Sequence, residues 1–382
     1  MIKIEFTKRR EILHGPVLTL ILIPYNYFII GGIYTLLNYQ IPDYILIAVS
    51  VLLALLHLIP MQIERKKSYK ITRLLVEISG IWLWMSFMYL FLNIALFIAD
   101  HITPIPNSIK LPALLLIIPI CAIIGYVNAH RNYIRSYDLY LKNRSDKQPE
   151  DVCIIHISDL HIGSSRTDTT IKQVVENINK IAQQKQKENI KTITIISGDI
   201  SDGSAPVLPD SYDELKKAKM PVIFTPGNHD YYQGIDNVKK ALENAHVIIL
   251  DDENIIYDEM GLNIIGLSFS FDAKNQEYKI PISDHLNNIL IYHVPSLWNE
   301  LSRQKIDVEL SGHTHGGQFY PMNFISEKIF KYNKGLFRNH IKDDDKGDYN
   351  SYLSVSEGVG TFAAPIRLGT HSEIVVLNIN RI

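Results

Sequence analysis

The chain has 382 residues, which is long for one ordinary domain, so we expect two structural units. Its 38 basic and 40 acidic residues nearly cancel to a net charge of −2, which argues against a nucleic-acid partner held through its phosphates. The two cysteines, Cys121 and Cys153, form neither a metal motif nor an obvious pair, and this excludes a disulfide framework.

Hydrophobic residues make up 47% of the chain, and nearly all the long apolar runs lie in its first third. A helix needs roughly 20 apolar residues to cross about 30 Å of hydrocarbon. Four stretches approach that length: 16–37, 44–61, 78–99 and 111–129. They are apolar all round, unlike soluble surface helices, and a cleaved signal peptide would have only one short apolar region. We therefore predict a four-helix transmembrane domain over residues 1–130.

Lys and Arg residues are distributed unevenly outside these spans. They cluster in the N-terminal segment, in the second loop and after the fourth span, whereas the loop 38–43 has none and the loop 100–110 has only Lys110. Basic residues in short loops are retained on the cytoplasmic side of the membrane. We expect an integral, multi-pass protein of the cell (inner) membrane, with both termini and the large C-terminal domain in the cytoplasm.

Three polar residues, Asn26, Glu77 and Asn93, fall within or at the ends of the predicted spans. Polar groups inside a membrane can mark a transport pathway. However, single Asn residues often bond across a helix bundle, and Glu77 lies at an expected span entrance. We favour the structural interpretation over a channel or transporter.

Residues 131–150 are basic and polar, with three interleaved Tyr residues. This composition suits a juxtamembrane linker that forms a helix on an anionic leaflet. Membrane lipids are therefore expected partners.

From residue 151 to residue 382 the pattern changes to short apolar runs bounded by Gly, Pro, Asn and Asp. Strands are expected at 152–157, 192–196, 221–225, 247–250, 262–267, 289–293, 308–310, 352–355 and 373–377, and helices at 169–185 and 236–244. This alternation is typical of βαβ units and predicts an α/β domain. Because late helices are scarce, a layered sandwich fits better than a simple doubly wound sheet.

Acidic, amide and imidazole side chains follow the expected strands, where open α/β sheets place their ligand sites. They are Asp159, His161, Asp199, Asn228, His229, Asp230, His293, His313 and His315. On extended backbone, the members of each pair two residues apart would share one side and could hold one cation. The set is large enough for two divalent cations, which can clamp the attacking and leaving oxygens of a phosphoryl displacement. Without thiolates, Mn, Fe or Zn at a hydrolytic centre is favoured.

Five segments, HISDLHIG, SGDISDG, TPGNHDYY, YHVP and LSGHTHGGQF, resemble the signature blocks of the calcineurin-like metallophosphoesterases, in the family order. The tail SVSEGVGTFAAPIRLG resembles the membrane-associated bacterial branch of that superfamily, although residues 370–373 depart from the Arg-Pro-Glu that often follows there. Elsewhere in the superfamily, some members cleave a UDP-linked acylated glucosamine. The resemblance implies a layered β-sandwich flanked by helices.

The resemblance also implies a role for each candidate residue. The first metal ion would be held by Asp159, His161 and His315, the second by Asn228, His293 and His313, and Asp199 would bridge both. His229 would protonate the leaving oxygen or stabilise developing charge, and Asp230 would hold its ring, while a metal-bridging hydroxide attacks phosphorus.

We expect a metal-dependent hydrolase of phosphodiester or pyrophosphate bonds in a lipid or lipid-linked substrate. The alternative enzyme is a tethered hydrolase of soluble (cyclic) nucleotides or other phosphoesters. The alternative from another class is a catalytically silent membrane sensor or transport protein. No ligand position is substituted, which argues against the silent protein.

Overall fold

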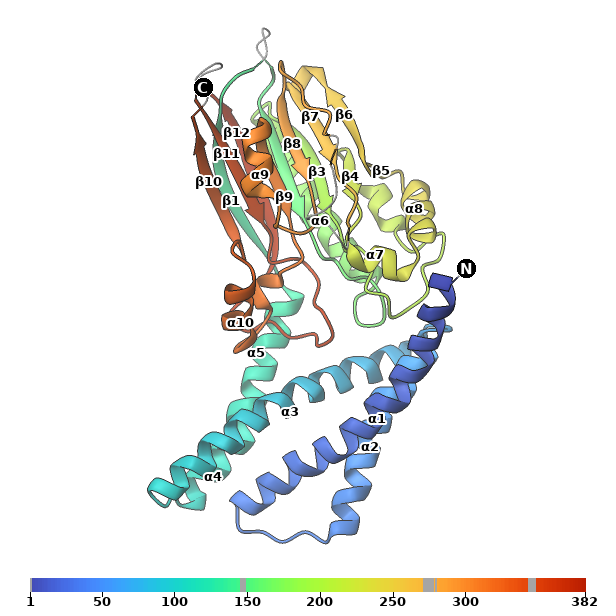
Figure 1. The fold of residues 1–382 in the computed structure, drawn as a ribbon, viewed down its shortest axis with the longest axis vertical. Helices are drawn as coiled ribbons and strands as arrows, with labels where there is room; N and C mark the ends of the chain where they lie inside the picture. Colours follow the sequence, from blue (N-terminus) through green and yellow to red (C-terminus); the bar gives the residue numbers. More distant parts are fainter. Residues whose placement is uncertain (1, 145–148, 271–277, 279, 343–347) are drawn as a thin grey trace. The chain divides into compact units, whose positions relative to one another are not determined.

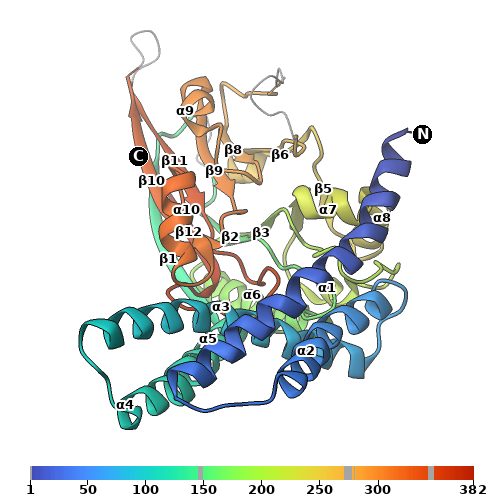
Figure 2. The same ribbon diagram turned by 60° about the horizontal axis from the view of Figure 1, so that its bottom comes forward.

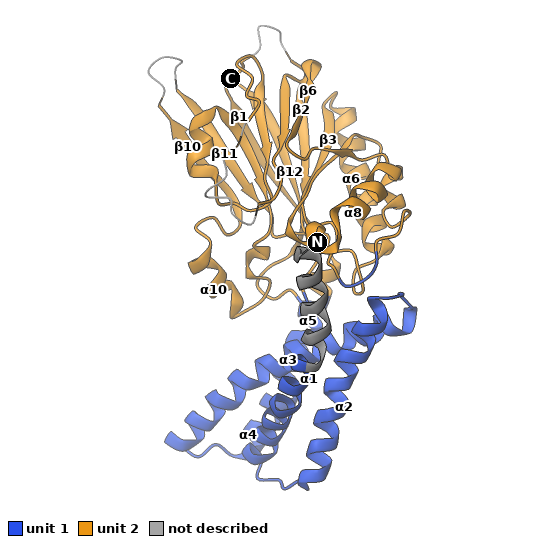
Figure 3. Ribbon diagram, turned by 45° about the vertical axis from the view of Figure 1, so that its right-hand side comes forward, with its two compact units in different colours: residues 1–126, 204–206, 363–366 blue, residues 127–203, 207–362, 367–382 orange. Residues whose placement is uncertain are grey.

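The computed structural model describes residues 2–144, 149–270, 278, 280–342 and 348–382, with side chains from residue 17 onward. The chain divides into two compact units, which Figure 3 colours separately. Unit 1 comprises Met1–Tyr126, Ser204–Pro206 and Ala363–Ile366. Unit 2 comprises Val127–Gly203, Val207–Phe362 and Arg367–Ile382.

Unit 1 is built from long apolar helices (Figure 1). They are α1 (Ile2–Leu36), α2 (Asp43–Glu64), α3 (Lys70–Ile102), α4 (Asn107–Pro112), a π-helical stretch (Ala113–Ile117) and α5 (Ile118–His130), whose last residues belong to unit 2. Among the described residues, four stretches are long and apolar enough to cross a membrane: Val17–Leu36, Asp43–Glu64, Lys70–Ile102 and Asn107–His130. The prediction of four long apolar helices is confirmed.

The fourth span changes from α-helix to π-helix over Ala113–Ile117, just before Pro119. Proline has no backbone N–H, and its ring clashes with the carbonyl four residues earlier in an α-helix. The wider π-turn relieves that crowding, so one continuous span from Asn107 to His130 survives an internal proline.

The polar residues of the spans bond within the helix bundle. Asn26 accepts a hydrogen bond from the indole of Trp82 at 3.1 Å, and Asn93 donates to the carbonyl oxygen of Ile29 at 3.2 Å. Tyr126 donates to Glu77 at 2.8 Å. These bonds satisfy polar groups between helices and support the structural interpretation.

In unit 2, the described residues form two six-stranded sheets. The first has the order β1-β12-β2-β3-β4-β5, with bounds Asn132–Leu141, Ser372–Arg381, Val152–Ile157, Lys191–Ser197, Val222–Thr225 and Ile248–Ile249. The second has the order β10-β11-β9-β8-β7-β6, with bounds Gly335–Ile341, Tyr349–Val355, Ile306–Ser311, Asn287–Ile291, Leu262–Gly266 and Glu253–Tyr257. Strands β2 to β5 run parallel, as do β7, β8 and β9.

The hydrophobic core of unit 2 has two main layers. One lies between the sheets and contains Ile154 and Ile193 of the first with Ile289 and Val308 of the second. The other lies between the first sheet and the helices α6 (Asp168–Lys187) and α8 (Ile235–Asn244). In α6 the buried residues are Ile171, Val174, Val175 and Ile178, the spacing of one helix face. The expected layered α/β sandwich is confirmed.

The structure corrects the expectation for the segment after the fourth span. Asn132–Leu141 is not a helix on the membrane surface but strand β1, which pairs in parallel with β12 from the C-terminal end of the chain. Its alternation of half-buried and exposed residues fits an edge strand. The spacing of Tyr and Leu residues in this segment is compatible with a strand as well as with an amphipathic helix. Pairing with β12 favours the strand.

Short helices complete unit 2: α7 (Asn228–Gln233), α9 (Trp298–Leu301) and α10 (Met322–Ile329). The sequence did not predict them, nor strands β6 and β10. Helices α7 and α10 lie at the same end of the two sheets, where the parallel strands have their carboxyl ends (Figures 1 and 2).

Candidate dinuclear metal site

The predicted ligands come from loops at the carboxyl ends of five strands. Asp159 and His161 follow β2, Asp199 follows β3, Asn228 follows β4, His293 follows β8, and His313 and His315 follow β9. Strands β2, β3 and β4 belong to one sheet, and β8 and β9 to the other. Because the sheets pack face to face, their ligand loops meet at one end of the sandwich.

Five of the ligand residues have left-handed backbone. The φ angle is 51° at Asp159, 49° at His161, 52° at Asp199, 71° at His313 and 50° at His315. The sequence-based argument that each pair shares a side of extended backbone is therefore wrong. Positive φ is rare outside glycine and is strained, so it persists where the surrounding structure enforces it. The local backbone is shaped to bring these side chains together.

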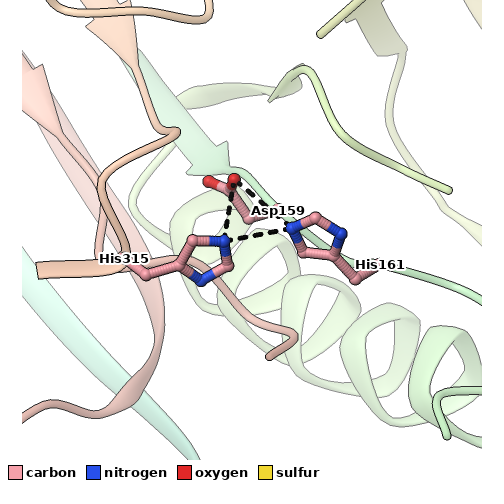
Figure 4. Close-up of side chains that lie close together, drawn as sticks. All are labelled: Asp159, His161 and His315. Carbon is pink, nitrogen blue, oxygen red and sulfur yellow. Dashed lines mark hydrogen bonds and ion pairs between the residues drawn. The ribbon is translucent and has the colours of Figure 1, made fainter. Parts of the chain in front are cut away.

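The first cluster consists of Asp159, His161 and His315, shown in Figure 4. The Nε2 atoms of the two imidazoles lie 3.0 Å apart. Oδ1 of Asp159 lies 3.3 Å from Nε2 of His315 and 3.7 Å from Nε2 of His161. All three residues are buried. Three potential ligand atoms thus converge on one point, as the resemblance implied for the first metal ion.

The second cluster consists of Asp199, His293 and His313. Oδ2 of Asp199 lies 3.1 Å from Nε2 of His293. Nδ1 of His293 donates to the carbonyl oxygen of Ser197 at 2.7 Å, which fixes the ring and leaves Nε2 for a cation. Nδ1 of His313 lies 2.9 Å from Oδ1 of Asn228, so the amide joins this cluster.

The two clusters are adjacent. Oδ2 of Asp199 lies 3.9 Å from Nε2 of His161, and Oδ1 of Asp159 lies 3.9 Å from Nε2 of His293. Each carboxylate therefore faces imidazoles of both clusters. Asp199 has the position that a bridging ligand requires, between one group of donors and the other.

Three glycines allow the loops to approach this closely. A Cβ atom on Gly227 would lie 2.2 Å from Oδ1 of Asp199, and one on Gly198 would lie 2.5 Å from Nδ1 of His293. A Cβ on Gly312 would lie 2.3 Å from Oδ2 of Asp159. The glycines beside the ligands thus keep the space around the donor atoms clear.

Burial and mutual attraction set the protonation of the site. Burial opposes charge on both Asp199 and His293, but their attraction outweighs it, lowering the pKa of the carboxyl and raising that of the imidazole. Burial lowers the pKa of His313 to about 4 and that of His315 to about 3. These two imidazoles are neutral at physiological pH, as ligands must be.

The donor set fits divalent cations. Without a cation, buried carboxylate oxygens and imidazole nitrogens would face one another, and protons could give only some of these atoms a hydrogen bond. The ligands are carboxylate, amide and imidazole, without thiolate, which suits Mn, Fe or Zn in a hydrolytic site.

His229 lies beside both clusters. Its Nδ1 donates to the carbonyl oxygen of Asp202 at 3.1 Å, and its ring packs edge-to-face on His161 with centroids 4.8 Å apart. Burial lowers the pKa of this imidazole. The Asp202 carbonyl holds the ring, which leaves Nε2 free of that contact.

The predicted role of Asp230 as the holder of the His229 ring needs correction. Its carboxylate accepts hydrogen bonds from the backbone N–H groups of Asp199 at 2.9 Å, Ser201 at 3.1 Å and Gly227 at 2.9 Å, and from the Ser201 hydroxyl at 2.8 Å. Asp230 thus ties the loop after β3 to the loop after β4. Sequence adjacency to His229 suggested a ring contact, but the turn of α7 directs the carboxylate elsewhere.

A buried arginine, missed by sequence reasoning, connects the first cluster to the last turn of the fourth span. The Arg367 guanidinium donates to the carbonyl oxygens of Glu357, Gly358 and Gly360 and lies 3.4 Å from Nδ1 of His315. The carbonyl oxygen of Arg367 accepts a hydrogen bond from Asn128 of α5 at 3.4 Å. Arg367 lies in the tail segment that carries the resemblance to the membrane-associated branch, which was the available signal.

Two aromatic side chains flank His229. Phe362 is 56% exposed, and its ring centroid lies 5.5 Å from that of His229. Tyr232 is 59% exposed, with a centroid distance of 5.4 Å. Gln318 fixes Phe362 through its backbone, accepting from its N–H at 2.7 Å and donating to its carbonyl oxygen at 3.1 Å. Large exposed aromatic surface therefore lies beside the metal site.

Residues 153–317 match the sequence profile of a family described as calcineurin-like phosphoesterase. An uncharacterized metallophosphoesterase of Helicobacter pylori is 27% identical over 271 residues, which cover 66% of this chain and 65% of that protein. Another from Aquifex aeolicus is 28% identical over 250 residues, 62% of this chain and 88% of its own. A Danio rerio protein described as a transmembrane protein with metallophosphoesterase domain is 24% identical over 290 residues, 68% of this chain and 60% of its own.

The match to the Helicobacter protein spans just under two thirds of that relative's length. The matched residues contain β2, β3, β4, β8, β9 and every ligand of the two clusters. With this site at the carboxyl ends of two packed sheets, residues 153–317 form a calcineurin-like phosphoesterase domain, in a chain that also has four helices able to span a membrane.

Proposed function

We propose that this protein is a membrane-anchored hydrolase of phosphodiester or pyrophosphate bonds in a lipid or lipid-linked substrate. Two divalent cations, Mn, Fe or Zn, would supply Lewis-acid activation of the phosphate and of the attacking water. The chain's own residues would bind them, position the substrate phosphate and handle the proton of the leaving group.

The ligands divide as the clusters suggest. Asp159, His161 and His315 would hold one cation; His293, His313 and Asn228 would hold the other; Asp199 would bridge them. His229 would donate a proton from Nε2 to the leaving oxygen, because Nδ1 is engaged by the Asp202 carbonyl. Asp230 would keep Asp199 and the α7 loop in register rather than act on the substrate.

The observation that supports the substrate proposal is the position of the last residues of the fourth span, which from Val127 onward belong to unit 2. Within unit 2, these residues make two hydrogen bonds: Asn128 donates to the carbonyl oxygen of Arg367, and Arg166 donates to the carbonyl oxygen of Ala129 at 2.7 Å. Arg367 in turn lies against the metal-site residue His315. One residue thus separates the end of a membrane span from the first cluster, which suits a substrate anchored in the bilayer.

The exposed aromatic rings support the same class of substrate. Phe362 and Tyr232 each pack edge-to-face with His229, where the group esterified to the phosphate would emerge. Exposed aromatic surface favours an apolar or planar group there. A lipid would offer acyl or alkyl carbon, whereas a soluble nucleotide would offer a base.

The experiment is a comparison of two phosphodiesters that differ only in chain length: methyl and hexadecyl p-nitrophenyl phosphate, in detergent micelles, with Mn added. We expect Phe362→Ala to lower kcat/KM for the hexadecyl ester by about tenfold, worth roughly 1.4 kcal/mol, and to leave the methyl ester within about twofold. Phe362→Leu, which keeps apolar volume, should retain most of the hexadecyl activity.

The same assay separates the alternatives. Hydrolysis of the methyl ester and of a cyclic nucleotide, with no preference for the hexadecyl ester and no effect of Phe362→Ala, would favour the tethered nucleotidase. No hydrolysis of any ester with Mn, Fe or Zn would contradict the proposal altogether and favour the catalytically silent protein.

We also propose that the metal site faces the cytoplasm, on the grounds of loop charge. The second loop carries Arg65, Lys66 and Lys67, whereas the loop 38–43 has no basic residue. The residues after the fourth span are basic as well, including Arg131 and Arg135.

A further inference from the structure

Helix α10 buries its polar face and exposes its apolar face, the opposite of a surface helix in a soluble domain. Its buried residues are polar, Asn323 and Ser326, whereas its large apolar side chains point outward. Phe324 is 58% exposed, Ile325 46% and Ile329 68%. A helix on the surface of a soluble protein buries its apolar face, so these three residues need an apolar environment outside the chain.

The polar side of α10 is specifically held by the protein. Ser326 donates to Oδ1 of Asn333 at 2.6 Å, and the carbonyl oxygen of Asn333 accepts from the hydroxyl of Thr314, which lies between the ligands His313 and His315. This orientation is therefore fixed by hydrogen bonds beside the metal site. Rolling the helix to bury Phe324 and Ile329 would break them.

A short path of direct bonds places α10 beside the end of the fourth span. Asn128, in the last turn of the span, donates to the carbonyl oxygen of Arg367. The next residue, Leu368, accepts at its carbonyl from the N–H of Tyr320 at 3.1 Å, and its own N–H donates to Gln318 at 3.2 Å. Tyr320, itself 45% exposed, lies two residues before α10 begins. All these residues belong to unit 2.

From this arrangement we infer that α10 lies in the membrane interface, with Phe324, Ile325 and Ile329 inserted at the boundary of headgroups and acyl chains. The last turn of the fourth span, which belongs to unit 2, marks where the bilayer begins. Its hydrogen bond to Arg367, and the bond from Tyr320 to Leu368, connect it to the segment just before α10. Lys328 on α10 and Lys331 just after it are exposed as well and suit anionic headgroups. This docking of unit 2 on lipid does not depend on which substrate the metal site hydrolyses.

Depth-dependent quenching tests this directly on the full chain. In a background with Cys121→Ala and Cys153→Ala, an Ile329→Cys variant would carry an environment-sensitive fluorophore and be reconstituted into phosphatidylcholine vesicles containing one quarter phosphatidylglycerol. The control is Ile256→Cys, which is 52% exposed on β6 and is paired with Asn263 near the amino end of β7, away from the ligand loops.

We expect lipids with a nitroxide high on the acyl chain to quench the probe at position 329 by at least about twofold and to leave the probe at position 256 unquenched. Adding Phe324→Asp should reduce the quenching at position 329 by about half, because a charge on the inserted face opposes insertion. Phe324→Ser serves as a second, milder variant, and the thermal transition of each protein establishes that it is folded.

Equal, weak quenching at positions 329 and 256 would overturn the inference. A second result would also overturn it: a blue-shifted probe at position 329 that lipid nitroxides do not quench and whose shift grows with protein density. That result would assign the face to contact between copies of the chain. Quenching at position 329 that is insensitive to Phe324→Asp would likewise contradict a docking role for this face.

Discussion

The carbonyl oxygen of Asp202 lies 3.1 Å from Nδ1 of His229. A carbonyl oxygen only accepts hydrogen bonds, so Nδ1 carries a proton, and the orientation of the ring is fixed from the loop after β3, which also carries Asp199. His229 also belongs to a group of three possible donors with His161 and Asp199. Two roles therefore compete for its Nε2 atom, proton donor and metal ligand.

We predict that His229→Ala retains both metal ions and loses turnover. Removing a general acid lowers kcat by about 10²- to 10⁴-fold, and the loss is smaller for a leaving group that needs no proton. The measurement compares kcat for a p-nitrophenyl ester with kcat for an alkyl ester, alongside metal content by mass spectrometry. Loss of one metal ion from His229→Ala would identify it as a ligand instead.

For Asp199 the prediction is the reverse. Asp199→Asn should lose metal occupancy and activity together, because the carboxylate faces imidazoles of both clusters. A chelator should lower the Tm of the wild-type protein, since a ligand bound only by the folded state stabilises it, and should have much less effect on Asp199→Asn. Unchanged metal content with near-normal hydrolysis in this variant would contradict the bridging role.

Because of the buried Glu309, we predict that the stability of the folded protein depends on pH. Burial raises the pKa of its carboxyl in β9 to about 8, from a usual value of 4.5. The folded protein therefore holds this proton between those pH values while the unfolded chain releases it, so this group makes stability fall as pH rises from 4.5 to about 8. Glu309→Gln removes the effect, which is on the order of 1.4 kcal/mol per unit of pKa shift.

The measurement is Tm against pH for both proteins. Glu309→Gln should have the higher Tm at pH 8, and the difference should shrink toward pH 5. A difference that is constant with pH would show that Glu309 does not titrate in this range. The Ser311 hydroxyl bonds to Oε1 of Glu309 at 3.3 Å and lowers the pKa of the carboxyl, so Ser311→Ala should raise that pKa and steepen the fall of Tm toward pH 8.

The proposed orientation can be tested by labelling. In the background without native cysteines, Pro42→Cys and Pro106→Cys should react with a membrane-impermeant thiol reagent in intact cells, because both lie in loops poor in basic residues. Ile256→Cys, exposed in unit 2, should react only after lysis. Labelling of position 256 in intact cells would place the metal site on the other side of the membrane.

Much of this protein was determined by local sequence. Membrane spans are set by the length and apolarity of a contiguous stretch, so 44–61 and 78–99 could be predicted without any tertiary information. The ligands could be predicted because strand, turn and ligand are adjacent in sequence, as in the segment from β2 to His161. Buried strands such as Val152–Ile157 were equally clear, because a continuous run of apolar side chains suits a strand covered on both faces.

Only the tertiary structure decided which of these residues meet. His313 and His315 are two residues apart but join different clusters, whereas Asp159 and His161, which have the same spacing and the same left-handed backbone, join one. Strand β1 exists through its pairing with β12, which is more than 200 residues away in sequence. The outward apolar face of α10 depends on hydrogen bonds from Ser326 and Thr314 to Asn333. Such contacts between distant segments leave no period or spacing in the sequence, and the fold alone creates them.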